Sequence, residues 1–308
     1  MRSTAALVVP ALSEPCAARG GNRDIGLRAD MNALFIKEMN EFHHKYVNKG
    51  KMHACGHDGH TAMLLGAARY LSEAKSFNGT IHFIFQPAEE GGAGAKAMMD
   101  DGLFEKFSCN AIYGLHNMPG IEAGHIGLRA GPIMAASDEF KIIFRGKGGH
   151  GAMPHKGTDA TIVAARFITA VQTIVSRETN PLEAGVVCVG HIAGGDSGSL
   201  NIIPAEVRFG GRTRSFKAEV RDRLEQRLEE IAHATAATFN CEADVAYQHG
   251  YPPTVNAPEQ VDIALIAARE AVGDDQVIEN MHNRYRVAKT SPSCSRKCRA
   301  VMSLSATA

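Results

Sequence analysis

Apolar runs and amphipathic stretches alternate along the first 130 residues of the chain. Runs of β-branched and aromatic residues predict buried strands at Ile25–Arg28, Thr80–Phe85 and Ala111–Leu115. Apolar residues at helical spacing predict one helix from Asp58, which could cap it, to Ser72, and another over Ala95–Asp101. Strands that alternate with helices are typical of an α/β fold with a largely parallel sheet.

Chemically active side chains follow these predicted strands at the points where the strands end. Asp30 follows the first strand, Glu89 and Glu90 follow the second, and His116 closes the third. The carboxyl ends of strands line the ligand crevice of an open α/β sheet. We therefore expect these four residues to converge on one place.

The pattern changes near Gly131-Pro132. Strands and helices are then predicted in the order β-α-β-β-α-β, which is that of a split, ferredoxin-like α+β unit. The predicted elements are Glu139–Arg145, Asp159–Arg177, Val186–Ile192, Ala205–Thr213, Ala218–Thr238 and Ala243–Tyr247. Helical sequence resumes at Pro258–Val272, so this unit reads as an insertion. The predicted domains are a catalytic domain of residues 1–130 plus 248–308, and an inserted domain of residues 131–247.

Composition and charge narrow the class of protein. The 308 residues are 44% hydrophobic and 21% charged, with zero formal net charge, which favours a soluble globular protein and gives no basis for a nucleic-acid or membrane partner. No apolar run reaches the roughly 18 residues of a membrane span. The apolar run Ala5–Leu12 is short and lacks a clear cleavage site, so we expect no export signal. Seven scattered cysteines fit a reducing cytoplasm better than a disulfide framework.

The segment His53–His60 carries one thiol, three imidazoles and one carboxylate in eight residues. Cys55 and His57 are one residue apart and can face one metal ion; a thiolate and an imidazole suit zinc, manganese or cobalt. Glu90 adds an oxygen ligand and His116 a second nitrogen ligand. Glu89 could stay unligated and take a proton from a water activated by the metal. The pattern predicts a water-activating hydrolase site.

Ordinary structural roles compete with this interpretation. A single cysteine is most often a small buried hydrophobe, a single histidine is often a core residue, and a Glu-Glu pair in a loop is usually only solvated. The joint pattern favours a metal site because its members adjoin Gly or Pro at the ends of strands and helices. Spacing by itself leaves both interpretations open.

Several motifs in one order resemble a known family, the amidohydrolase branch of the aminoacylase/carboxypeptidase metallopeptidases, which includes hippurate hydrolases, N-acyl-amino-acid amidohydrolases and auxin-conjugate hydrolases. The resemblance spans about residues 25–216. The matching segments are Gly26–Met31, His53–His60, Gln86–Gly92, Gly114–Asn117, Gly148–His155, Asn201–Pro204 and Arg214–Phe216.

The resemblance implies a di-metal catalytic domain with an inserted lid that also forms a homodimer. Two divalent ions, manganese or zinc with cobalt or nickel as further options, are implied. By matching position the implied ligands are Cys55, His57, Glu90 and His116, and Glu89 is the implied general base.

Three further roles on the inserted domain come from the same resemblance. His150 resembles a residue that reaches a partner subunit's site and stabilises the oxyanion. Asn201 and Arg214 resemble substrate contacts, and Arg214 suits the amino acid's carboxylate. Without the resemblance, His150 would be interpreted as a turn residue among glycines and Arg214 as a surface charge.

The implied function is metal-dependent hydrolysis of the amide bond of an N-acyl amino acid. A rival within the class is a deacylase for a diaminopimelate or cysteine conjugate. A rival from another class is an inactive remnant that retains only the dimerisation domain and a partial metal site. A thiol-redox role for Cys294 and Cys298 is the weakest alternative.

The chain departs from the family pattern at several positions and at both ends. Asn32 stands where the family usually has Asp, Phe35 where it has Pro, and Arg212 where it has a small hydroxyl residue. The family's longer stretch before the first strand, with its His-x-x-Pro-Glu segment, has no counterpart here. The family's closing Ser-Glu-Asp-Phe-Ser segment and terminal His are also missing.

The codons from Ala288 onward, read one base out of register, can encode Glu-Asp-Phe-Ser-Phe-Met-Leu-Gln and further family-like text. We therefore hypothesise a frameshift near Arg286, which sequencing of the gene across that codon would test. Loss of the terminal His and the last strands would remove one metal ligand and leave an exposed sheet edge. On this hypothesis the chain is expected to be poorly stable and weakly active or inactive.

Overall fold

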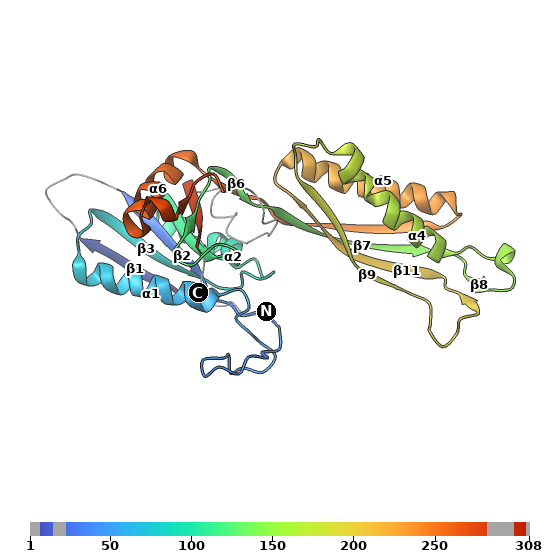
Figure 1. The fold of residues 1–308 in the computed structure, drawn as a ribbon. Coiled ribbons are helices and arrows are strands. Elements are labelled where there is room, and N and C mark those ends of the chain that lie inside the picture. Colours follow the sequence, from blue (N-terminus) through green and yellow to red (C-terminus); the bar gives the residue numbers. More distant parts are fainter. Residues whose placement is uncertain (1–6, 15–22, 282–298, 306–308) are drawn as a thin grey trace. The chain divides into compact units, whose positions relative to one another are not determined.

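The structure, a computed structural model, describes residues 7–14, 23–281 and 299–305 (Figure 1). Contacts divide the chain into two compact units. Unit 1 contains the residues up to Ile133 and those from Thr254 onward, apart from a short stretch outside the described residues, and unit 2 contains Met134–Pro253. Unit 1 is therefore formed by segments on both sides of unit 2 in the sequence.

A seven-stranded mixed sheet forms the centre of unit 1, in the order β1-β3-β2-β4-β15-β5-β14. At its middle β2 pairs in parallel with both β3 and β4, and β15 pairs in parallel with β4. This arrangement agrees with the largely parallel sheet that the sequence predicts. The strands are β1 (Leu7–Glu14), β2 (Asp24–Asp30), β3 (Gly79–Gln86), β4 (Ala111–Asn117), β5 (Ile126–Gly127), β14 (Val277–Ile278) and β15 (Arg299–Ser305).

Helices cover both faces of this sheet, because alternate side chains of each strand point to opposite faces. Ile81, Phe83 and Phe85 of β3 pack in one cluster with Leu64 of α1, whereas Ile84 packs with α2. Helix α6 packs beside β4 in a third cluster. The helices are α1 (His57–Ala74), α2 (Gly94–Asp100), α3 (Leu103–Lys106), α6 (Pro258–Val272) and the 3-10 turn η3 (Asp274–Gln276).

Two expectations about unit 1 are wrong. Asp58 does not cap the first long helix; α1 starts at His57, Gly56 is its N-cap, and Asp58 lies in the first turn. The edge of β4 is not left unpaired, because Arg299–Ser305 forms β15 along the whole length of β4. Backbone groups can form such a ladder whatever side chains the strand carries.

Unit 2 is a four-stranded antiparallel sheet in the order β12-β7-β11-β9, with two helices against it. The chain order is that of the predicted β-α-β-β-α-β unit. Its elements are β7 (Ala136–Arg145), α4 (Ala160–Val171), β9 (Gly185–Gly194), β11 (Glu206–Ser215), α5 (Ala218–Thr238) and β12 (Glu242–Tyr251). Short elements complete the fold: β6 (Gly131–Met134) with β13 (Thr254–Asn256), β8 (Gly149–His150) with β10 (Ile202–Ile203), and the turn η1 (Pro154–Lys156).

The core of unit 2 lies between the sheet and its helices. Phe140, Ile142 and Phe144 of β7 and Phe167 of α4 are fully buried there. The expected helix over Asp159–Arg177 is interrupted: α4 ends at Val171, and Ile174–Glu178 forms a π-helical segment, η2. Within the described residues, no helix has the length and apolar character needed to cross a bilayer.

Candidate metal centre

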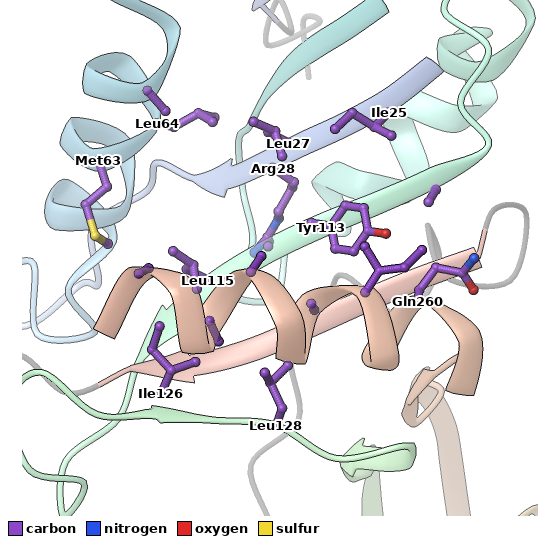
Figure 2. Close-up of a pocket in the computed structure, with 18 of the residues that line it drawn as sticks. Ile25, Leu27, Arg28, Met63, Leu64, Tyr113, Leu115, Ile126, Leu128 and Gln260 are labelled. Atoms are coloured by element: carbon purple, nitrogen blue, oxygen red, sulfur yellow. The ribbon is translucent and has the colours of Figure 1, made fainter. Parts of the chain in front are cut away.

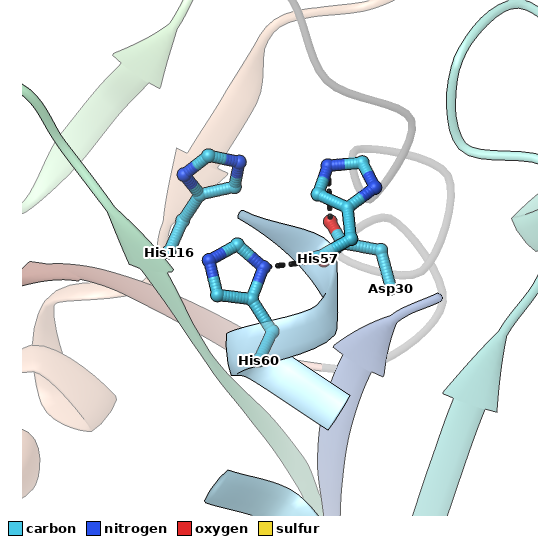
Figure 3. Close-up of side chains that lie close together, drawn as sticks. All are labelled: Asp30, His57, His60 and His116. Atoms are coloured by element: carbon cyan, nitrogen blue, oxygen red, sulfur yellow. Dashed lines mark hydrogen bonds and ion pairs between the residues drawn. The ribbon is translucent and has the colours of Figure 1, made fainter. Parts of the chain in front are cut away.

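Side chains from several segments meet at the carboxyl end of the central strands. Asp30 comes from the last position of β2, His116 from β4, and His57 and His60 from the first turn of α1 (Figure 3). Asp30, His57, His60 and His116 are all buried, and one ligand atom from each lies within 4.8 Å of the others. Of the four residues expected to converge at the strand ends, Asp30 and His116 belong to this group.

A second group of ligand atoms shares His57 with the first. Cys55, His57 and Glu90 also place ligand atoms within 4.8 Å of one another. The Sγ atom of Cys55 lies 3.7 Å from Nε2 of His116, close to the roughly 3.5 Å expected for a thiolate and an imidazole on one tetrahedral zinc ion. All four residues proposed as ligands from the sequence are thus near one another. Their thiol, imidazole and carboxylate donors fit divalent transition metals.

Backbone carbonyl groups fix the orientation of two of these imidazoles. Nδ1 of His57 donates to the carbonyl oxygen of Asn32 at 2.9 Å, and Nδ1 of His116 donates to that of Asn117 at 2.5 Å. Each ring therefore carries its proton on Nδ1 and keeps Nε2 as the nitrogen with a lone pair. Metal-binding histidines in proteins are commonly held in this way by a second partner.

The two consecutive glutamates differ in exposure. Glu89 is 2% exposed, whereas the side chain of Glu90 is 30% exposed. An oxygen of Glu89 lies 3.9 Å from Nε2 of His57, and an oxygen of Glu90 lies 4.0 Å from the same atom. Both carboxylates therefore face the imidazole that the two groups of ligand atoms share.

A buried hydrogen-bond network holds the carboxylate of Asp30. Nη1 of Arg28 donates to Oδ2 of Asp30 at 2.9 Å, and Nε and Nη2 of Arg28 donate to Oε1 of Gln86. Burial raises the pKa of the Asp30 carboxyl group, but Arg28, the hydrogen bond from His60 and nearby His57 together hold that pKa well below its usual value. Asp30 is therefore a carboxylate at neutral pH.

His60 is a supporting residue that the sequence did not assign to a role. Its Nδ1 lies 2.6 Å from Oδ1 of Asp30, and its Nε2 accepts the backbone N–H of Asn117 at 3.0 Å. Both ring nitrogens of His60 are thus held by protein groups, one by Asp30 and the other by Asn117. The signal in the sequence was its position three residues after His57, which places both on one helix face.

Gly56 precedes α1 with a φ of 76°, in the left-handed region that favours glycine. A Cβ atom at this position would lie 2.5 Å from Oδ1 of Asn117. Glycine is therefore required for two reasons, the backbone turn between Cys55 and His57 and the close approach of Asn117.

A cavity of about 900 Å³ lies behind the polar cluster. It is lined by α1, β2, β4 and α6, and Figure 2 labels Met63 and Leu64 of α1 and Tyr113 and Leu115 of β4 among the lining side chains. His60 of the metal-ligand cluster also lines it, as does Arg28, which donates to Asp30. An apolar space thus adjoins the polar site within unit 1.

The other predicted site residues lie in unit 2. His150 is exposed on β8 and is paired with Ile202 of β10, and the N–H of Gly151 donates to the carbonyl of Asn201 at 2.7 Å. The structure therefore brings His150 and Asn201 side by side.

Arg214 lies elsewhere in the same unit, eight residues along β11 from Glu206, the strand's first residue. This separation is about 26 Å at the usual rise of a strand. Burial and neighbouring Arg212 lower the pKa of the Arg214 guanidinium. Cys294, Cys298 and the suspected frameshift point lie outside the described residues.

Comparisons with known proteins agree with this geometry. Residues 26–294 match the profile of peptidase family M20/M25/M40. The chain belongs to this family. The family resemblance predicted from the motifs is therefore confirmed.

Two curated relatives illustrate the amidohydrolase branch of the M20/M25/M40 family. The chain is 45% identical over 248 residues to an N-acetyl-L-cysteine deacetylase of Bacillus subtilis (strain 168), covering 80% of this chain and 59% of that protein. It is 41% identical over 256 residues to a hippurate hydrolase of Campylobacter jejuni, covering 82% of this chain and 66% of that protein. The chain thus spans less than two thirds of the length of each relative.

A solved structure extends the comparison to the fold. The chain resembles a Bacillus subtilis protein described as a dinuclear metal-binding peptidase of the M20 family, with 29% identity and a TM-score of 0.77. The match covers 94% of this chain and 73% of that one. The predicted α/β fold class is confirmed by this similarity.

Proposed function

We propose that this protein is a metal-dependent amidohydrolase that cleaves the amide bond of N-acyl amino acids. The observation that carries the proposal is the convergence of Cys55, His57 and Glu90 within 4.8 Å beside buried Glu89. The activities for which two relatives are named, deacetylation of N-acetyl-L-cysteine and hydrolysis of hippurate, support the same substrate class. The proposed cofactors are two divalent ions, manganese or zinc.

The proposed chemistry divides the work between the ions and the side chains. When bound, divalent ions would polarise the amide carbonyl and lower the pKa of water toward about 7. Cys55, His57, Glu90 and His116 would hold the ions. Glu89 would take a proton from the attacking water and pass it to the leaving amine nitrogen.

Residues of unit 2 complete the proposal. We assign His150 to stabilisation of the oxyanion in a partner subunit's site, and Asn201 and Arg214 to contacts with the substrate. The contact between the segments of His150 and Asn201 supports a shared location for these two. Arg214 lies near the far end of β11 from Glu206, and we assign it to a different part of the substrate or a different copy.

A homodimer through unit 2 and a cytoplasmic location form part of the proposal. Strand β9 ends the sheet of unit 2, and its second half is exposed, so its backbone can pair with another copy. Among the described residues, Cys188 and Cys241 are free thiols, which suits a reducing compartment. Sedimentation analysis of the purified chain would test the dimer.

Metal content and amide hydrolysis together test the function. The purified chain should bind about two Mn²⁺ ions, as a dinuclear site requires, and release glycine from N-benzoylglycine or cysteine from N-acetyl-L-cysteine. Cys55→Ala should lose metal and activity, whereas Cys109→Ala, a matched change at a half-buried thiol of unit 1, should retain both. A parent chain that binds no metal and cleaves neither substrate would favour an inactive remnant and overturn the proposal.

A further inference from the structure

One residue forms hydrogen bonds both with His57 and with the loop that carries Glu89 and Glu90. Asn32 lies two residues beyond the end of β2. Its backbone carbonyl oxygen accepts the Nδ1–H of His57 at 2.9 Å, and its side-chain Oδ1 accepts the backbone N–H of Glu89 at 2.8 Å. The first bond orients a candidate ligand, and the second holds the loop that carries Glu89 and Glu90.

The position of Asn32 follows from how the β2–β3 ladder ends. The register ends at Asp30 opposite Gln86, and the N–H of Met31 still donates to the carbonyl of Gln86 at 3.1 Å. Pro87 then offers no N–H, so a backbone ladder cannot continue in the usual way. Beyond Pro87 the side-chain Oδ1 of Asn32 accepts a backbone N–H from the loop, that of Glu89.

The backbone of Glu89 is held on its other side as well. The N–H of Gly91 donates to the Glu89 carbonyl at 2.9 Å, and the N–H of Gly94 donates to the carbonyl of Ala88 at 3.2 Å. Ala88 has a φ of 48°, so the loop turns sharply just before Glu89. A backbone in this uncommon conformation persists only where surrounding contacts hold it.

We propose that Asn32 is a positioning residue that sets the metal affinity of the site by holding His57 and the Glu89–Glu90 loop in one arrangement. The inference rests on the proposed function, because it assumes that these residues bind a divalent ion. The side-chain oxygen of Asn32 accepts the Glu89 N–H, and this acceptor is the feature on which the positioning role depends. Supporting contacts of this kind typically change metal affinity by about 10- to 100-fold.

Three variants of the full chain separate this role from general stability. Asn32→Leu keeps the approximate size of the side chain and removes the acceptor. Asn32→Asp keeps an acceptor oxygen and serves as the conservative rescue. Asn110→Leu is the matched control, because Oδ1 of Asn110 accepts the backbone N–H of Asp24 at 2.8 Å at the opposite end of β2.

The affinity for Mn²⁺, measured by titration calorimetry, is the main readout. Asn32→Leu should bind Mn²⁺ about 10- to 100-fold more weakly than the parent chain, while Asn32→Asp and Asn110→Leu should stay near the parent. The visible spectrum of the Co²⁺-loaded chain gives a second readout. Its thiolate-to-cobalt absorption should persist in Asn32→Leu with altered ligand-field bands, because Cys55 is intact and the loop that carries Glu90 has lost its hydrogen bond to the side chain of residue 32.

The outcomes distinguish this inference from the proposed function. Mn²⁺ affinity and Co²⁺ spectra that are unchanged in Asn32→Leu would overturn the positioning role and leave the metal site standing, provided that His57→Ala abolishes binding. Equal losses of Mn²⁺ affinity in Asn32→Leu and Asn110→Leu would also overturn the positioning role, since they would indicate general destabilisation. If Asn32→Leu does not fold, Asn32→Ala replaces it in the same comparison. A parent chain that binds no divalent ion would overturn both proposals.

Discussion

Oδ1 of Asp30 lies 2.6 Å from Nδ1 of His60 in the buried part of unit 1. The other carboxylate oxygen of Asp30 is bonded to Arg28, so one side chain compensates a buried guanidinium and orients an imidazole. Both the Asp30 and the Arg28 side chains are almost completely inaccessible to water. The stability of unit 1 and the order of the candidate metal centre therefore depend on the same carboxylate.

The change Asp30→Asn should destabilise the protein strongly. It leaves Arg28 buried without a compensating charge, which costs about 3–5 kcal/mol. The urea midpoint, followed by circular dichroism, measures the effect. Glu73→Gln is the control, because Glu73 pairs with Arg69 on the surface and such pairs contribute no more than about 1 kcal/mol. A shift in Asp30→Asn no larger than in this control would contradict the prediction.

Substitutions at the two consecutive glutamates should affect metal binding and catalysis separately. On the proposed function, Glu90→Gln weakens metal binding, whereas Glu89→Gln keeps the metal and lowers kcat about 10²- to 10⁴-fold because the general base is lost. Metal content after dialysis and steady-state kinetics with N-benzoylglycine measure the two effects. Loss of metal in Glu89→Gln, with retention in Glu90→Gln, would reverse the assignment of the two residues.

Asp138 in unit 2 should make stability depend on acid pH. Burial raises the pKa of this carboxyl group, but the paired Arg221 guanidinium and the hydrogen bonds from Gly250 and Tyr247 outweigh burial and lower that pKa. A carboxyl group whose pKa is lowered on folding stabilises the protein above its unfolded pKa of about 3.9, and this contribution is lost as pH falls through the folded pKa.

The variant Asp138→Asn should therefore melt at a lower temperature at neutral pH and lose less stability than the parent as pH falls to about 3. Thermal unfolding across this pH range measures both effects. Asp244→Asn on the same sheet is the matched control, because the Asp244 side chain is 65% exposed beside Arg145. If the melting temperatures of Asp138→Asn and the parent fall in parallel as pH falls, the link between Asp138 and acid stability is contradicted.

The core of unit 2 should be sensitive to cavities at Phe167. Its ring is fully buried and packs edge-on against Phe144 and Phe209 at centroid distances of 5.3 and 5.6 Å. Phe167→Ala should cost about 3–5 kcal/mol, from lost burial and the remaining cavity. Ile162→Ala on the same helix, at a side chain 45% exposed, should change stability by no more than about 0.5 kcal/mol. Similar urea midpoints for the two variants would refute the prediction.

Local patterns were sufficient for much of the fold. The predicted bounds of α5 and α6 agree with the structure, β2 and β3 extend the predicted strands by one or two residues at each end, and β4 extends its predicted strand by two residues at the carboxyl end. These elements could be predicted because alternation and helical spacing record which side of a strand or helix is buried. The interruption of the helix after Val171 could not be predicted, because the apolar pattern continues through the π-helical segment.

The sequence by itself determined which residues could bind a metal and that they follow the ends of neighbouring strands. It determined this because strand ends and residue chemistry are local properties. Only the tertiary structure decided that Asp30 holds His60, that Asn32 joins His57 to Glu89, and that Arg299–Ser305 pairs with β4. Each of these contacts joins residues at least 25 positions apart, so it depends on where the backbone is placed and leaves no period in the sequence.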